Sequence, residues 1–87
     1  MILTYLRLRL LEDLHRRIRG GEFTERGLAR RLGVSQPHIH NILKGARVMS
    51  LELADHIIAD LEIPAERLLS AEDLLRIHRR KIDRERS

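Results

Sequence analysis

The chain has 87 residues and a formal net charge of +4, with 43% hydrophobic and 34% charged residues. This length predicts one small domain with a modest core. The absence of cysteine excludes a disulfide scaffold and a thiolate metal site, and it suits a reducing cytosol. The only aromatic residues are Tyr5 and Phe23, so the core must be aliphatic, and the Leu-, Ile- and Arg-rich composition favours an all-helical fold.

The opening segment, residues 1–6, is apolar, but Arg7 and Arg9 interrupt it at once. It is too short to span a membrane, and its order of charges is not that of a secretion signal. We therefore expect a cytoplasmic protein that is neither exported nor embedded in a membrane.

Apolar residues at three- and four-residue steps predict an amphipathic first helix over residues 3–19. Basic residues crowd its last turn, and Gly20 fits the left-handed residue that follows a helix. The apolar stripe of this helix consists of Leu3, Leu6, Leu10, Leu14 and Ile18.

Two short helices are predicted over residues 24–32 and 35–43, joined by a tight turn at Gly33. Gly33 permits the positive φ of a sharp turn, and the small Ala29 lets the two helices approach closely. This spacing is the one that a DNA-reading helix-turn-helix needs, and it predicts binding to an operator. The residues expected to pack the motif are Leu28, Ala29, Leu32, Gly33, Val34, Ile39 and Ile42.

Ser50 is predicted to cap a fourth helix over residues 50–61, and Pro64 to open a short fifth helix over residues 64–69. A capping-box sequence that begins at Ser70 predicts further helix.

The expected architecture is therefore an all-α, compact five-helix bundle with a helix-turn-helix over residues 1–69. A C-terminal helical extension over residues 70–87 follows it. One narrow face of this extension either pairs with a second copy or packs on the first helix of its own chain. That face consists of Leu74, Leu75, His78 and Ile82.

Positive charge is concentrated around the predicted helix-turn-helix. Between Arg26 and Leu51 the chain has five Lys or Arg residues and no Asp or Glu, whereas the remainder has 12 against 13. A basic surface beside a reading helix is the electrostatic signature of phosphate binding. The alternative is an Arg-rich protein whose charges are only solvated.

The third predicted helix turns a polar face away from the core when Ile39, Ile42 and Leu43 face inward. Gln and Asn side chains pair with the N6 and N7 of adenine, His donates to a guanine acceptor, and Pro contacts a thymine methyl. The alternative is that these residues only solvate an exposed helix. The pattern predicts base contacts from Gln36, Pro37, His40 and Asn41, and phosphate contacts from Thr24, Ser35 and Arg47.

Metal binding and catalysis are not predicted. His38 and His40 are two residues apart on a helix, so their side chains diverge by about 200° and do not chelate one ion. The sequence contains no phosphate loop or nucleotide fingerprint and no catalytic constellation. We expect no cofactor, no metal and no enzymatic activity.

A larger set of positions extends the helix-turn-helix pattern. They are Phe23-Thr24, Leu28-Ala29, Leu32-Gly33-Val34-Ser35, Ile39, Ile42, Gly45, Ser50-Leu51-Glu52-Leu53, Ile57, Leu61, Ile63 and Leu68-Leu69. On these residues the chain resembles the lambda-repressor-like (Cro, or XRE) family of helix-turn-helix DNA-binding proteins. The resemblance implies a compact five-helix bundle that acts as a homodimer on a pseudo-palindromic operator in double-stranded DNA.

By this resemblance Lys44 also falls where the family reads bases, together with Gln36, Pro37, His40 and Asn41. The chain departs from the family at four positions. Glu25 stands where Gln often faces a phosphate, Leu43 replaces a common Glu, Met49 a common Pro, and Glu62 a common helix-ending Gly.

The leading expectation is a sequence-specific transcriptional regulator of the phage-repressor or controller type. One alternative is an antitoxin that autoregulates its operon and binds a toxin protein through the segment from Ser70 onward. Another is a protein-interaction adaptor that has lost DNA binding. Only the first two predict salt-sensitive binding to DNA.

Overall fold

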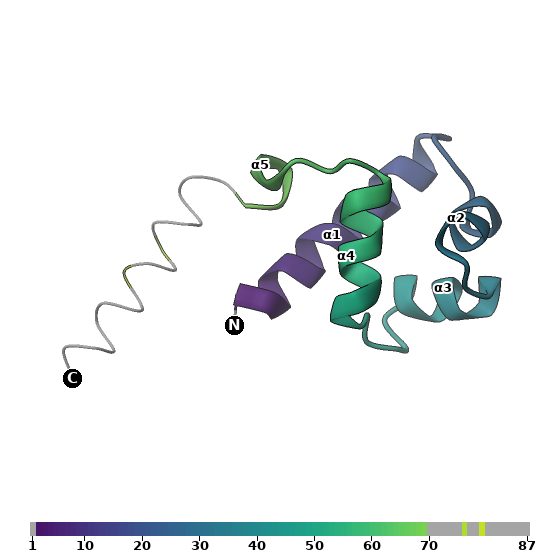
Figure 1. Ribbon diagram of the computed structural model, residues 1–87, viewed down its shortest axis with the longest axis horizontal. Coiled ribbons are helices and arrows are strands. Elements are labelled where there is room, and N and C mark those ends of the chain that lie inside the picture. Colours follow the sequence, from purple (N-terminus) through teal and green to yellow (C-terminus); the bar gives the residue numbers. More distant parts are fainter. Residues whose placement is uncertain (1, 70–75, 77–78, 80–87) are drawn as a thin grey trace.

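The computed structural model describes residues 2–69, 76 and 79 (Figure 1). Every regular element in this part of the chain is a helix, and the predicted all-α bundle is confirmed. Each of the five helices begins and ends within one residue of its predicted bounds. The predicted extension over 70–87 lies outside the described residues, apart from positions 76 and 79. The helices are α1 (Ile2–Arg19), α2 (Glu25–Leu32), α3 (Gln36–Leu43), α4 (Leu51–Asp60) and α5 (Ala65–Leu68).

The helices α2 and α3 pack against each other at one end of the body, and α4 packs on α2 (Figure 1). The long helix α1 passes behind α4, and α5 contacts α1 away from α2 and α3. None of the helices in the described ranges is long and apolar enough to cross a bilayer.

The hydroxyl residues predicted as caps start α2, α3 and α4. Thr24, Ser35 and Ser50 each accept a hydrogen bond from the backbone N–H three residues later, at 3.0 to 3.2 Å. Each bond satisfies a donor that has no partner inside the helix and contributes about 1 kcal/mol to stability.

In each of the helices α2 to α5, the residue just before the N-cap is apolar. A second apolar residue lies five positions after the first, inside the helix, which is the spacing of a hydrophobic staple. All eight residues are buried or half-buried in the core. The local signals that start the helices therefore agree with the packing of the whole molecule. The pairs are Phe23 with Leu28, Val34 with Ile39, Met49 with Ala54, and Ile63 with Leu68.

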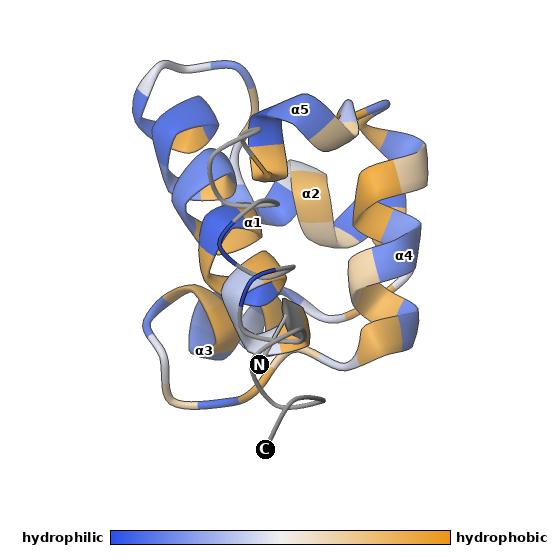
Figure 2. Ribbon diagram, turned by 90° about the vertical axis from the view of Figure 1, so that its left-hand side faces the viewer, coloured by the Kyte–Doolittle hydropathy of each residue, from blue (hydrophilic) through white to orange (hydrophobic). Residues whose placement is uncertain are grey.

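The core is aliphatic except for Met49, as the composition predicts for a chain with two aromatic residues. Apolar and polar residues alternate along α1 and α4 in the pattern of amphipathic helices (Figure 2). The largest fully buried side chains come from four helices and are Leu10, Leu14, Leu28, Ile42 and Ile57.

The end of α1 corrects one prediction. The residue with a positive φ is Gly21, at 77°, and not Gly20. The N–H of Glu22 donates to the carbonyl of Arg17 at 2.9 Å, and this bond wraps the chain around Gly21. The helix ends at Arg19 as predicted, but the N–H of Gly20 still donates to the carbonyl of Arg16 at 2.9 Å, so the second glycine of the pair takes the left-handed conformation.

Candidate nucleic-acid interface

The turn between α2 and α3 is closed by Gly33, which adopts φ 71° and ψ 27° in the left-handed region. The N–H of Val34 donates to the carbonyl of Ala29 at 3.0 Å across this turn. Nothing lies within 4 Å of where a Cβ on Gly33 would stand, so the backbone conformation and not the available space requires glycine here.

Most of the residues predicted to pack the motif lie in the core or against it. Ala29 is 3% exposed and Ile39 is 2% exposed, and both belong to the core. Leu28 and Ile42 are also buried, whereas Leu32 and Val34 are half-buried against the same core. Ala29 and Ile39 thus belong to one buried cluster, and the helices that carry them pack against each other.

Four of the five residues predicted to read bases are exposed on α3 or at its end: Gln36, Pro37, His40 and Lys44. The fifth, Asn41, is half-buried. Its backbone carbonyl accepts hydrogen bonds from the N–H groups of Ala46 and Arg47, at 2.9 and 3.1 Å. The chain after α3 folds back at this point, which makes Asn41 less accessible than its helical position alone predicts.

Two side chains in the first turn of α2 contact the exposed face of α3. The Nε of Arg26 donates to Oε1 of Gln36 at 3.3 Å, and Nδ1 of His40 lies 3.1 Å from Oε2 of Glu25. Because Arg26 only donates hydrogen bonds, its contact places the amide oxygen of Gln36 on the side of α2. Sequence reasoning missed both partners, since no spacing along the chain reports a contact between two helices.

A third contact holds the other end of α3. The Nε2 atom of His15 on α1 lies 2.8 Å from the carbonyl oxygen of Leu43, the last residue of α3. A carbonyl only accepts, so the proton of this hydrogen bond lies on Nε2 of His15. The helix α3 is thus held by contacts with α2 at its start and with α1 at its end.

The predicted phosphate-binding residues Thr24, Ser35 and Arg47 are all exposed. The two hydroxyl oxygens accept from the backbone as caps, but each hydroxyl proton is still available for donation to an acceptor such as a phosphate oxygen. Thr24 and Ser35 precede the two helices of the motif, and Arg47 follows α3.

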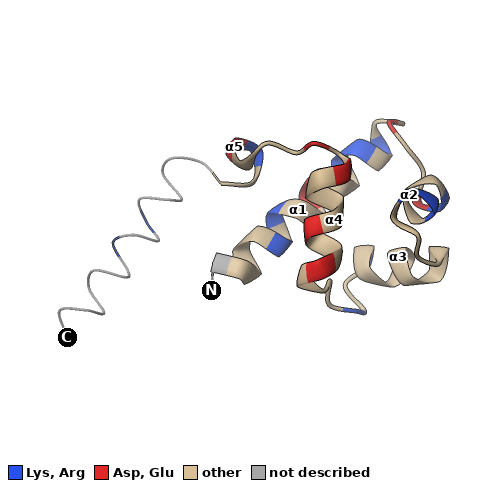
Figure 3. Cartoon of the chain, viewed as in Figure 1, with Lys and Arg blue, Asp and Glu red and all other residues tan. Residues whose placement is uncertain are grey.

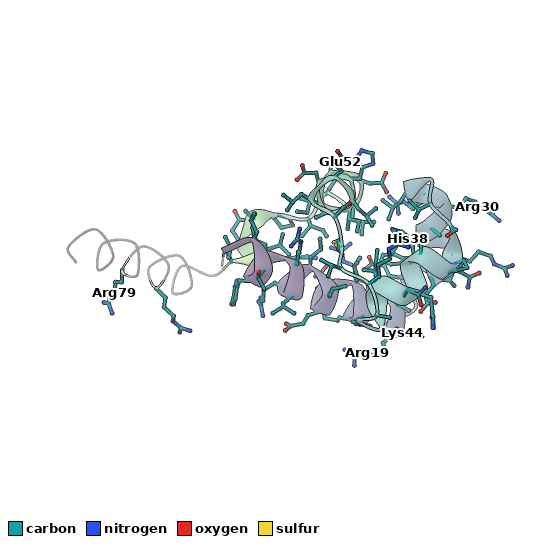
Figure 4. All side chains as sticks on the ribbon, turned by 90° about the horizontal axis from the view of Figure 1, so that it is seen from below. Arg19, Arg30, His38, Lys44, Glu52 and Arg79 are labelled. Carbon is teal, nitrogen blue, oxygen red and sulfur yellow. The ribbon has the colours of Figure 1, made fainter. Side chains whose placement is uncertain are left out.

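Charge differs between the α2–α3 end and α4. Acidic residues lie along α4, whereas α2 carries several arginines (Figure 3). Arg31 forms an ion pair with Asp60 at the end of α4, with Nε 2.8 Å from Oδ2, so it joins the two regions. Arg30 projects outward from α2 at the right of Figure 4, whereas Lys44 at the end of α3 and Glu52 on α4 lie at the bottom and the top of that view.

No group of three His, Cys, Asp or Glu side chains is arranged to hold a metal ion within the described part of the chain. Comparisons with protein-family models, curated proteins and solved structures give no match to this chain. The features of the chain that bear on its function are therefore the geometry of α2, the Gly33 turn and α3.

Proposed function

We propose that this protein belongs to the sequence-specific double-stranded DNA-binding proteins. Within that class we propose that it is a transcriptional regulator that reads an operator with α3. The observation that carries the proposal is a short, capped helix with an exposed row of hydrogen-bonding side chains, held on a rigid body by the Gly33 turn. Such a helix fits the major groove, where each base pair presents a distinct pattern of donors and acceptors.

In this proposal Gln36, Pro37, His40, Asn41 and Lys44 contact base edges. The exposed cations and the hydroxyl donors at the helix starts contact the backbone of the DNA. Each neutralised phosphate releases condensed counterions, so affinity falls steeply as salt rises.

A homodimer on a pseudo-palindromic operator is part of the proposal, because one reading helix contacts only a few base pairs. Two copies place equivalent helices in half-sites about 34 Å apart. We propose that residues from Ser70 onward mediate this pairing. Light scattering compares the full chain with a chain that ends at Leu69; an equally dimeric shortened chain contradicts a role of the C-terminal segment.

A second candidate function is binding of another protein, as in an antitoxin that also regulates its own operon. In this candidate the partner binds the segment from Ser70 onward, which follows the last of the five helices. Co-expression with the product of a neighbouring gene, followed by purification, tests this candidate. A complex that includes the product supports it, and separation of the two proteins opposes it.

The main proposal is tested by selection from a pool of randomised double-stranded DNA with the full chain. We expect enrichment of one sequence with two related halves. Recovery of DNA without any enriched sequence, or no recovery at low salt, contradicts sequence-specific reading.

A further inference from the structure

The exposed imidazole of His40 has one defined neighbour. Its Nδ1 lies 3.1 Å from Oε2 of Glu25, the first residue of α2. The His40 side chain is 56% exposed and that of Glu25 is 30% exposed. A carboxylate is favoured in the first turn of a helix by the helix dipole, so α2 itself supports Glu25 at this position.

This contact determines which ring nitrogen of a neutral His40 carries the proton. An ionised carboxylate only accepts hydrogen bonds, so the proton of the contact lies on Nδ1. The second nitrogen, Nε2, has no hydrogen-bond partner among the residues that the structure describes. A neutral His40 therefore presents Nε2 as an acceptor, and a charged His40 presents it as a donor.

No other side chain around His40 replaces Glu25 in this role. From α2 the remaining charged groups are Arg26, which donates to Gln36, the exposed Arg30, and Arg31, which pairs with Asp60. From α3 the charged neighbour is Lys44, one helical turn beyond His40. All four are cations without an acceptor, so only Glu25 fixes the position of the proton.

We infer that Glu25 sets the base preference of His40 and makes it depend on pH, an inference that rests on the proposed function. Neutral His40 accepts through Nε2 from the exocyclic amine of cytosine or adenine. Charged His40 donates through the same atom to O6 or N7 of guanine. The sequence-based expectation that His40 donates to guanine thus applies to the charged form alone.

The tautomer is measured on the free full-length chain by nitrogen-15 NMR of the imidazole rings at about pH 8.5, above the ordinary titration range of histidine. We expect His40 to carry its proton on Nδ1. In the same spectrum His15 carries its proton on Nε2, because it donates to the carbonyl of Leu43, and it serves as an internal reference. A neutral His40 protonated on Nε2 overturns the inference.

Two matched variants extend this measurement. Glu25→Gln keeps the shape of the side chain but lets it donate as well as accept, so we expect His40 to lose its exclusive Nδ1 proton. Glu52→Gln removes one exposed carboxylate from α4 and should leave the His40 signals unchanged. If the His40 tautomer is unchanged in a folded Glu25→Gln variant, the inference is contradicted. If that variant does not fold, the spectrum of the unmodified protein still tests the position of the His40 proton.

The base preference is measured by DNA selection at about pH 8.5 and about pH 5.5, with His40→Ala identifying the position that His40 reads. At that position we expect cytosine or adenine at the higher pH and about a fivefold shift toward guanine at the lower pH. Glu25→Gln should accept guanine at both values. Specific binding with the same preferred base at both pH values overturns the inference. Failure of the unmodified chain to select any sequence overturns the proposed function. The NMR measurement on the free chain does not depend on DNA binding and tests the position of the His40 proton in either case.

Discussion

The ends of α2 and α4 share one backbone geometry but carry different residues. In each, a backbone N–H just past the helix donates to a carbonyl five residues earlier, from Val34 to Ala29 and from Ile63 to Ile58, both at 3.0 Å. The left-handed residue is Gly33 after α2 and Glu62 after α4, where φ is 50°. The turn that positions α3 is thus free of the backbone strain that the turn before α5 carries.

The same two regions differ in charge and in the number of contacts that hold them. The α2–α3 end is fixed by glycine, by two capping hydroxyls and by contacts from Glu25, Arg26 and His15 to α3 or its side chains. Acidic residues lie along α4 (Figure 3), and the short helix α5 that follows it has Pro64 at its N-cap position and no side-chain cap. More caps and side-chain contacts therefore hold the α2–α3 end, where the proposed base contacts require a defined geometry, than hold the region after α4.

The largest expected effect on stability is at the interface of α2 with α3. Ala29→Leu inserts a large side chain into a filled core and should lower the free energy of unfolding by about 1–3 kcal/mol. Urea unfolding measures the change. Ala59→Leu is the matched control, because Ala59 is exposed on α4; equal stability of the Ala29 variant and the unmodified protein contradicts the packing described above.

A smaller effect is expected at the turn itself. Gly33→Ala forces an L-residue into the left-handed region and should destabilise the protein by about 1 kcal/mol, after a small gain from the stiffer unfolded chain. A Cβ at this position meets no atom within 4 Å, so a loss in the melting temperature reports backbone strain and not a clash. A variant that melts at or above the unmodified protein is incompatible with the strain argument.

The smallest expected effect has the opposite sign. Glu62→Gly should relieve the strain after α4 and stabilise the protein by about 0.5 kcal/mol, because the lost strain exceeds the added entropy of the unfolded chain. The control Glu66→Gly places glycine inside α5 and should destabilise. If thermal unfolding shows both variants to be destabilised, the two turns do not differ in strain as proposed.

The features that sequence predicts well are those that depend on a few neighbouring residues. Thr24, Ser35 and Ser50 cap their helices because hydroxyl side chains satisfy nearby N–H groups, and Gly33 turns the chain because only glycine adopts its φ at little cost. The helix ends at Arg19 as predicted, but the Gly20 prediction was wrong because the N–H of Gly20 still donates to the carbonyl of Arg16, and the left-handed residue comes one position later, at Gly21. Glu62 stands where proteins of the family that the sequence resembles often have a helix-ending glycine, and the positive φ of Glu62 agrees with this difference.

The contacts that sequence does not predict join residues from different helices. Glu25 with His40, and Arg26 with Gln36, become neighbours only when α2 and α3 pack at a particular angle. The partial burial of Asn41 likewise depends on how the chain after α3 folds back. Residue types at the candidate site are therefore readable from the sequence, whereas their mutual orientation requires the three-dimensional structure.

The central claim, that α3 reads bases, is tested most directly by comparing affinities for the selected DNA and for random DNA. Gln36→Ala should weaken binding to the selected site by about 1–3 kcal/mol and leave random DNA nearly unaffected, whereas Arg47→Ala should weaken both similarly. Arg67→Ala on α5, away from α2 and α3, is the control and should change neither. Equal losses on selected and random DNA for Gln36→Ala would contradict the account.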